Sequence, residues 1–572
     1  MQAFPRMSLL APLLCILSLA CQQQSATPGA SVVPPSSPSA ATAPVTPKVT
    51  RVVLAVPAPG AESPKPTNVS TTNIWPIKPA YEFLWGVSVE GEANVPQLAE
   101  SWTLGPDGKS FHFQLHKGVQ FHRGMGEFTS KDVLYSWEQL TAPDSQEGRR
   151  ERWLSSVPKV EAVGDYEVVF NLKEPDQSFV WSFGEPDAGL RIMSKADGEA
   201  RTRWSYDDPA IAGTGPYAIT ERQQGQFIRF RRDVAPHYRK TPDFPEFEFR
   251  YVKENSTRLA ALLTKEIQIA ALPLDLIPQA EAKGMKAIKA RAQLGFQTFI
   301  VFLGPSVNKK YTAADPDPVP GGQPYRYMNT PLLDGRVRQA LNKAINRDEL
   351  NKAFFKGQGE PIYNTFFHPT RPGWNPDWVR RFPQEYGYDP EAAKRLLAEA
   401  GYGPNNPLKH TLLTVSFGLF PELSDMVEAI ANYWRAIGVD VTIDNSDPAV
   451  QTQKRNRQEY DNHSYIAGTS VRQFFGFGAY GVGNGYVGGR SGAEFIEPSE
   501  VFQNQLRWTF DQSKLNTLWR QVGDMAYDLK APAPLFWLPT YAVVDPNLVA
   551  DYPFSGTTTG TYTNVEYIKA AK

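Results

Sequence analysis

The distribution of cysteine is the strongest constraint on how this chain can fold. Its 572 residues contain two cysteines, Cys15 and Cys21, and both stand within the first 21 positions. Everything from residue 22 onward therefore lacks disulfides, thiolate zinc ligands and cysteine nucleophiles. A body of this length must be held together by buried apolar surface, which 41% hydrophobic residues can supply over several lobes or domains.

Charge and hydropathy exclude two further classes. Lys and Arg number 59 and Asp and Glu 60, so the net charge is −1. Proteins that bind nucleic acid usually carry an excess of basic residues, which this chain lacks. We therefore expect no nucleic-acid partner. After residue 20 no apolar stretch approaches the roughly 18 residues of a membrane span. The body is therefore predicted not to be integral to a membrane.

The first 21 residues have the pattern of a secretory signal peptide, with Arg6 near the start, an apolar run at 8–20 and then Cys21. The end of the run, Leu-Ser-Leu-Ala-Cys at 17–21, resembles a bacterial lipobox, with Ser18 where leucine is more usual. This resemblance implies that the thiol of Cys21 takes a diacylglycerol and becomes the site of lipid attachment. The alternative is a secreted protein in which Cys21 is incidental.

Residues 22–49 are predicted to form a disordered tether. They are rich in Gln, Ser, Ala, Thr and Pro and carry one charge, on Lys48, so they cannot bury enough apolar surface to fold. As polyproline II the tether would reach roughly 80 Å, which would let the body move above a membrane that holds the acyl chains. We expect an exported protein, lipid-anchored to the cell membrane and facing the periplasm or the cell exterior.

Strand-like and helix-like segments alternate from residue 50 onward, which predicts an α/β protein. The expected strands are 51–56, 111–115, 166–172, 227–230 and 247–252. The expected helices are 257–263, 337–355, 390–400 and 421–437. The helix at 390 is well delimited, because Asp389 can cap it, Pro390 suits its first turn and Gly401 can end it.

Several motifs follow one another in a characteristic order. The first are VPQLAESW at 95–102, GPDG at 105–108, FHFQL at 111–115, KGVQFH at 117–122 and TSKDV at 129–133. Later ones are GTGPY at 213–217, DGRVRQALN at 334–342, YDPEAAK at 388–394 and WRAIGV at 434–439. Over about residues 50–550 the chain thereby resembles the family 5 extracellular solute-binding proteins, the dipeptide and oligopeptide receptors of bacterial ABC importers.

The resemblance implies a two-lobed fold like that of class II periplasmic binding proteins, with an extra subdomain in the first lobe. We map lobe I to 50–75, 206–299 and 526–572, the subdomain to 76–205, and lobe II to 300–525. It also implies a monomeric receptor that is no enzyme and has no cofactor. Such a receptor closes over a peptide, an oligosaccharide or an anionic solute and delivers it to a membrane permease, because the ligand favours the closed state it binds better.

Peptide-binding members resemble one another in the second lobe, where an aromatic residue lies near an aspartate that pairs with the peptide's ammonium. The corresponding stretch here, 465–475, has no acidic residue and contains an arginine. A buried ammonium without a carboxylate is unfavourable, so this departure disfavours a peptide with a free N-terminus. The candidate ligand-binding residues are Tyr465, Thr469, Arg472, Phe474 and Phe475, which suit an anionic group or a sugar. The alternative is a surface arginine beside core phenylalanines.

Patterns typical of other chemistry lack their structural context. Glycine motifs at 476–481 and 483–488 have the spacing of a dinucleotide loop but no helix after them. His112, His116 and His122 could share a strand face, but Lys117-Gly118 interrupts that strand, so no metal site is predicted. Two alternatives stay open: a secreted hydrolase on a receptor-like scaffold, whose triad need not be local in sequence, and a solute sensor or chaperone not coupled to transport.

Overall fold

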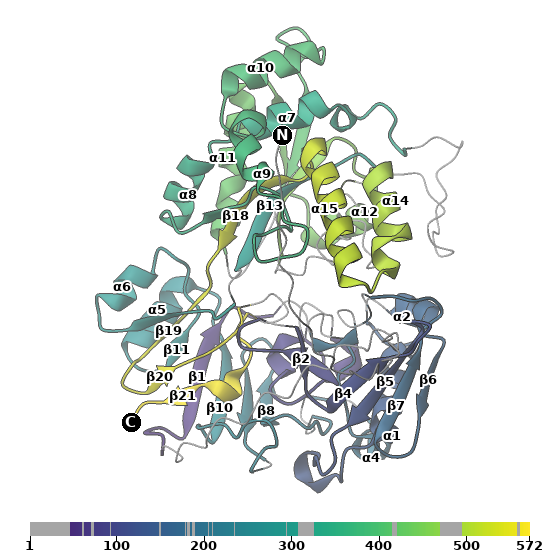
Figure 1. Ribbon diagram of the computed structural model, residues 1–572. Helices are drawn as coiled ribbons and strands as arrows, with labels where there is room; N and C mark the ends of the chain where they lie inside the picture. The colour runs from purple at the N-terminus through teal and green to yellow at the C-terminus, as the bar shows by residue number, and fades with distance from the viewer. Residues whose placement is uncertain are drawn as a thin grey trace, which may run out of the picture. The chain divides into compact units, whose positions relative to one another are not determined.

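Three larger β-sheets organise the chain in the computed structural model (Figure 1). The structure describes residues 46–572, except for 60–61, 70–73, 92, 148–149, 178, 180–182, 186–188, 204, 207, 209, 234, 293–294, 307–324, 415–419, 470–492, 494 and 557–560. We name the parts built on the sheets of seven, six and four strands the first lobe, the second lobe and the subdomain.

The first lobe contains the seven-stranded sheet, in the order β12-β19-β11-β1-β10-β9-β8. Its strands are β1 Arg51–Val56, β8 Ala218–Gln223, β9 Phe227–Arg231, β10 Glu246–Tyr251, β11 Ile269–Ala270, β12 Lys286–Lys289 and β19 Tyr541–Val544. The central β1 is buried at every position after Arg51, as expected of a strand covered on both faces. It pairs in parallel with β10 and β11, so the carboxyl ends of all three strands lie at one edge.

The second lobe contains the six-stranded sheet, in the order β14-β18-β13-β17-β15-β16. Its strands are β13 Phe296–Leu303, β14 Glu360–Pro361, β15 Lys409–Leu413, β16 Asp440–Asp444, β17 His463–Thr469 and β18 Ala533–Leu538. The neighbouring strands β13 and β18 are buried along their whole length, which explains their continuous apolar character. In this sheet β15 runs parallel to both β16 and β17.

The chain passes between these two sheets twice, from β12 to β13 and from β18 back to β19. The described ends of the two crossings, 290–295 and 539–540, lie beside each other, because the N–H of Ala290 donates to the carbonyl of Thr540 at 2.9 Å. At the other end of the first crossing, a Cβ on Gly295 would stand 2.0 Å from the carbonyl oxygen of Leu538. Two adjacent crossings form the short connection on which a hinge between lobes depends.

The subdomain contains the antiparallel sheet β4-β5-β7-β6 and an aromatic core. Its elements are β2 Trp85–Val87, β3 Ala93–Pro96, β4 Ala99–Leu104, β5 Ser110–Leu115, α1 Ser130–Thr141, α2 Arg150–Ser156, β6 Lys159–Ala162, β7 Glu167–Asn171 and α4 Lys195–Ala200. The β4–β5 hairpin turns at Gly108, whose φ of +70° favours glycine. Trp85 stacks on Phe113 with ring centroids 4.8 Å apart, and both side chains are buried.

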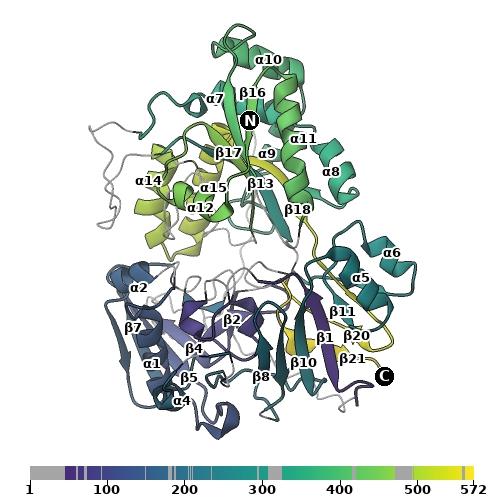
Figure 2. The same cartoon turned by 180° about the vertical axis from the view of Figure 1, so that it is seen from behind.

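Helices cover both faces of the second lobe's sheet, as the opposite views of Figures 1 and 2 show. They are α7 Gly335–Lys343, α8 Arg347–Phe355, α9 Asp377–Glu385, α10 Pro390–Glu399, α11 Glu422–Ala436, α12 Pro448–Asn456, α14 Ile496–Asn504 and α15 Gln512–Leu529. α11 contacts β15, β16 and β17. The first lobe carries α5 Asn255–Leu263 and α6 Ile277–Glu281 on β11 and β12, and a two-stranded sheet of β20 Val549–Asp551 and β21 Lys569–Ala570.

The expected strands and helices are present with small shifts at their ends, with one exception. The prediction of a single helix over 337–355 is wrong, because α7 ends at Lys343 and α8 begins at Arg347. The side chain of Asn346 accepts a hydrogen bond from the N–H of Glu349 at 3.1 Å and starts a new helix. The helix predicted at 390 has the expected cap, since Asp389 accepts from the N–H of Ala392 at 2.8 Å.

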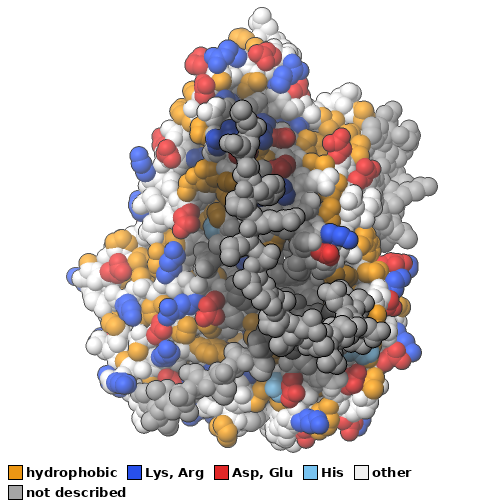
Figure 3. Space-filling view, in the orientation of Figure 1, with side chains coloured by type: hydrophobic (Ala, Val, Ile, Leu, Met, Phe, Trp, Pro, Cys, Tyr) orange, Lys and Arg blue, Asp and Glu red, His pale blue; other side chains and the backbone are white. Residues whose placement is uncertain are grey.

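Within the described part of the chain, every helix is too short or too polar to cross a membrane. On the face shown in Figure 3, basic and acidic side chains are intermixed with hydrophobic ones. This distribution fits the near-neutral net charge of −1.

Candidate functional site

Two of the predicted ligand-binding residues lie on β17, at the middle of the second lobe's sheet. Tyr465 and Thr469 are four residues apart and therefore face the same side, and their exposed fractions are 5% and 4%. The guanidinium of Arg455 lies over the ring of Tyr465, 4.6 Å from its centroid. Thr469 is the last residue of the strand. The other three predicted residues, Arg472, Phe474 and Phe475, fall outside the described residues, as does Cys21.

A glutamine that the sequence did not single out stands opposite Thr469. Gln297, on β13, is fully buried and pairs with Thr469 across the sheet. Its side-chain oxygen accepts a hydrogen bond from the N–H of Phe366 at 3.2 Å, at a position where the backbone is left-handed with φ of +73°. The signal in the sequence was a lone amide within the apolar run FQTFIVFL. This amide fixes the segment that passes the end of β17.

The first lobe presents aromatic and cationic side chains at the carboxyl edge of its sheet. Tyr251 ends β10 beside Val56, the end of β1, and the N–H of Tyr251 donates to the carbonyl of Gln226 at 2.8 Å. Arg222, on β8, stacks on Tyr206 at 4.9 Å and donates to the carbonyl of Pro64 at 3.0 Å. Burial lowers the pKa of Arg222 and raises that of Tyr251. In open α/β sheets, ligands bind in the crevice beyond such an edge.

A small cavity of about 30 Å³ lies where the first lobe meets the subdomain. Its charged and amide-bearing lining residues come from remote parts of the sequence: Lys78, Glu82, Gln97, Glu185, Arg239, Asn564 and Glu566. Ligand pockets for organic molecules usually measure about 300–1,000 Å³, so this space suits water molecules.

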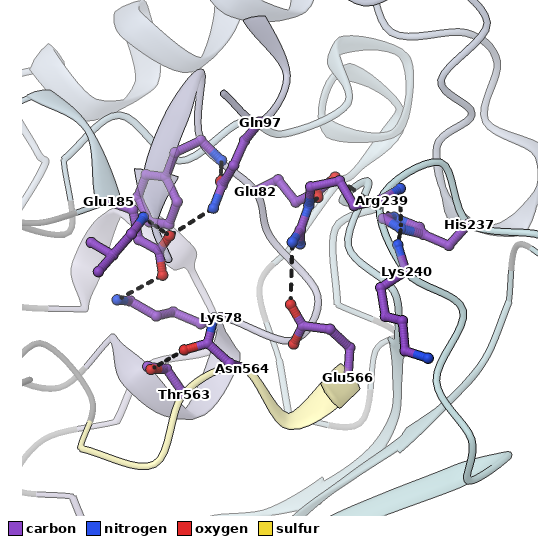
Figure 4. A network of polar contacts seen from close by, with 12 residues as sticks. Lys78, Glu82, Gln97, Glu185, His237, Arg239, Lys240, Thr563, Asn564 and Glu566 are labelled. Carbon is purple, nitrogen blue, oxygen red and sulfur yellow. Dashed lines mark hydrogen bonds and ion pairs between the residues drawn. The ribbon is translucent and has the colours of Figure 1, made fainter. Parts of the chain in front are cut away.

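The charges around this cavity are paired with one another. Arg239 donates to Glu82 and also to Glu566, the latter at 3.2 Å (Figure 4). Burial alone would lower the pKa of Arg239. The carboxylates of Glu82 and Glu566 have the larger effect, so the pKa lies well above its usual value and the guanidinium stays charged. On the other side, Glu185 accepts from Gln97 at 2.6 Å and pairs with Lys78 at 3.3 Å. The cluster joins the C-terminal segment to the subdomain and is a structural junction.

The three histidines weighed as metal ligands have separate partners. His112 and His116 lie 3.3 Å and 3.1 Å from the carboxylates of Glu167 and Glu100. His122 is buried, its Nε2 lies 2.7 Å from the carbonyl oxygen of Gly215, and burial lowers its pKa. In the part of the chain that the structure describes, no group of three or more His, Cys, Asp or Glu side chains could hold a metal ion.

The fold and the arrangement of its sheet edges define a class of protein: an α/β solute-binding protein of two lobes joined by two adjacent crossings. Residues 94–474 match the family described as bacterial extracellular solute-binding proteins, family 5. The chain belongs to this family, which confirms the resemblance predicted from its motifs. Because the family consists of binding proteins, the prediction that the chain is not an enzyme is also confirmed.

Curated relatives are identical to this chain at about a quarter of the aligned positions. The chain is 28% identical over 302 residues to the glutathione-binding protein GsiB of Pectobacterium atrosepticum, which covers 51% of this chain and 53% of that protein. It is 26% identical over 318 residues to the dipeptide-binding protein of Escherichia coli K12, covering 52% and 54%. The chain thus spans about half the length of the curated relatives it matches.

Solved structures confirm the predicted fold class. The peptide-bound periplasmic binding protein DppA of Helicobacter pylori matches with a TM-score of 0.70 and 23% identity over 91% of this chain and 98% of that one. The binding protein AgaA of A. tumefaciens, in complex with agropinic acid, matches with a TM-score of 0.69 and 21% identity over 91% and 99%. At these identities the likeness shows a shared fold.

Proposed function

We propose that the protein is the substrate-binding receptor of an ABC importer, which captures a peptide or another small organic solute between its lobes and delivers it to a membrane permease. The family match over residues 94–474 carries this proposal. The adjacent crossings at 290–295 and 539–540 support it, because they leave the lobes free to close on a ligand. In this role the protein acts as a monomer.

We further propose that the ligand carries an anionic group. The stretch 465–475 contains Arg472 and no acidic residue, so it offers a cation and no carboxylate for an ammonium group. The tyrosine-rich first-lobe edge around Arg222 can add polar and stacking contacts. One similar protein is named a glutathione-binding protein, and another was solved in complex with agropinic acid. Both ligands carry carboxylates, which agrees with this preference.

Export and a lipid anchor complete the proposal. The apolar run before Cys21 supports a mature chain that begins at a lipidated cysteine. The proline-rich stretch at 22–49 would then be a tether that leads from this cysteine to the folded body, which begins near β1. A receptor held in this way remains near its permease while its body moves.

The ligand can be sought directly. Protein purified under native conditions is denatured, and released molecules are identified by mass spectrometry. Calorimetry and thermal shift against panels of peptides, anionic conjugates of amino acids and oligosaccharides follow. We expect one chemical class to bind and to raise the melting temperature. No released molecule and no binding in any panel would contradict the proposal.

The lipid anchor can be tested with a matched control, because the chain has two cysteines close together and only Cys21 is the proposed attachment site. Cys21→Ser should move the protein from the membrane fraction to the soluble fraction and abolish incorporation of labelled fatty acid. Cys15→Ser, within the predicted signal peptide, should leave both unchanged. Equal behaviour of the two variants would contradict lipidation at Cys21.

A further inference from the structure

A short segment of the second lobe contacts the subdomain directly. This segment, 506–510, connects α14 to α15 and includes the short helix Leu506–Trp508. We propose that it forms a clasp with Gly108, Pro175 and Gln177 of the subdomain, and that this clasp stabilises the closed arrangement of the lobes. The proposal rests on the proposed function, since closure is how such a receptor retains its ligand.

The polar half of the clasp is one hydrogen bond. The side-chain amide of Gln177 donates to the carbonyl oxygen of Leu506 at 2.7 Å, across 329 residues of sequence. The acceptor is held firmly, because the Leu506 side chain is fully buried in the core of the second lobe. A short, half-buried bond of this kind contributes a net stabilisation of the state in which it forms.

The apolar half of the clasp is the ring of Phe510. Phe510 packs against the aromatic core of the subdomain, although it belongs to the second lobe in sequence. A Cβ built on Gly108 would stand 3.5 Å from Cε2 of Phe510 and 3.3 Å from Cβ of Pro175. The Phe510 ring therefore lies beside the β4–β5 turn, with little more than the space of a methyl group between them, and closure removes this apolar surface from water.

Both surfaces are ordered by contacts of their own lobe. In the second lobe, Asp511 caps α15 by accepting from the N–H of Ser513 at 2.9 Å and of Lys514 at 3.2 Å. In the subdomain, the N–H of Lys109 donates to Asp107 at 2.9 Å, and the N–H of Leu172 donates to the carbonyl of Lys109. Little conformational freedom is lost when preformed surfaces meet.

The clasp would act on affinity without touching the ligand. The crossings at 290–295 and 539–540 are covalent, whereas the clasp joins elements that are not part of either crossing. It can therefore form in the closed state and break in the open one. A receptor whose closed state is more populated binds with a higher apparent affinity, in proportion to that population.

The test uses the full chain with Cys15 and Cys21 replaced by serine, so that dyes can be placed at Lys131→Cys in the subdomain and Lys394→Cys in the second lobe. The side chains of Lys131 and Lys394 are 68% and 48% exposed. Ligand is removed by unfolding and refolding, and single-molecule energy transfer then measures the closed-to-open ratio. Because no ligand is present, this measurement tests the clasp alone, and its result does not depend on whether a ligand for the receptor is found.

Phe510→Ala and Gln177→Glu should each lower the closed-to-open ratio at least about fivefold, the effect of losing roughly one net hydrogen bond or its apolar equivalent. Gln177→Glu keeps the shape of the side chain and removes its hydrogen-bond donor. It therefore tests the clasp even if Phe510→Ala fails to fold. Tyr388→Ala, an aromatic truncation on the second lobe at a half-exposed residue, should leave the ratio unchanged. An unchanged ratio in both clasp variants, or an equal change in Tyr388→Ala, would overturn the proposal.

Discussion

The ring of Phe296 occupies the space where a side chain of residue 468 would stand. Gly468, on β17, has no side chain, and a Cβ built there would lie 2.2 Å from Cε1 and Cζ of Phe296. Phe296 in turn stacks on Phe420 with ring centroids 4.8 Å apart. The glycine therefore lets an aromatic pair lie across the strand that carries Tyr465 and Thr469.

Gly468→Ala should displace Phe296 and lower the free energy of unfolding by about 1–3 kcal/mol, as overpacking of a dense core does. Gly403→Ala is the matched control, because a Cβ there would meet no atom within 4 Å. Chemical denaturation of both variants measures the difference. Equal stability of the two variants would show that Phe296 moves without cost.

Arg239→Met should strongly destabilise the junction between the first lobe and the subdomain. The substitution leaves the carboxylates of Glu82 and Glu566, which are 2% and 6% exposed, without their guanidinium partner. Removing one member of such a buried pair lowers stability by about 3–5 kcal/mol. Thermal and chemical denaturation are the measurements.

Arg380→Met is the control for the loss of an arginine. Arg380 pairs with Asp377 on the surface of α9, where the two side chains are 73% and 57% exposed. Its replacement should change stability by less than about 1 kcal/mol. A similar loss in the Arg239 and Arg380 variants would contradict the importance of the buried junction.

Stability should depend on pH through Glu422, at the start of α11. Burial raises the pKa of Glu422 to about 7, and the neighbouring Asp275 and Asp425 carboxylates add to the rise. The folded state therefore holds a proton that the unfolded state releases, so this contribution is full below about pH 4.5 and is lost as the pH rises through about 7.

Glu422→Gln should remove this loss and raise stability at pH 8 by on the order of 2 kcal/mol relative to the wild type. Glu428→Gln, at an exposed position of the same helix, serves as the control. Denaturation at several pH values between 5 and 8 gives the two profiles. If the Glu422 variant and the wild type fall in parallel, the account of Glu422 is wrong.

Arg472→Ala should weaken binding of an anionic ligand by more than about 1.5 kcal/mol, the contribution of a charge-assisted hydrogen bond. Calorimetry on the ligand identified by mass spectrometry measures the change. Arg435→Ala, at a surface ion pair with Glu428 in the second lobe, is the control. Unchanged affinity in the Arg472 variant would remove this residue from the site.

The strands and most helices could be predicted because their signals are local. The run at 51–56 and the cap at Asp389 are examples, since alternation, burial and capping act over a few residues. The break between α7 and α8 also had a local signal, the capping amide of Asn346, but the apolar pattern of the two helices concealed it. The lobe and subdomain boundaries remain predictions.

The polar junctions could not be predicted, because their members are remote in sequence. Arg239 meets Glu82 across 157 residues and Glu566 across 327. Arg338 lies within the motif at 334–342; it is 3% exposed and donates to the carbonyls of Leu332 and Leu529 at 2.5 Å and 2.6 Å. Only the tertiary fold shows that such cations satisfy buried carbonyls and carboxylates.

Closure of the lobes on a small organic solute should make the protein more compact. Small-angle X-ray scattering of the full chain with Cys21→Ser, titrated with the ligand recovered from the purified protein, measures this change. The radius of gyration should fall as ligand is added and level off at one ligand per chain. Saturable binding in calorimetry with an unchanged radius of gyration would contradict it.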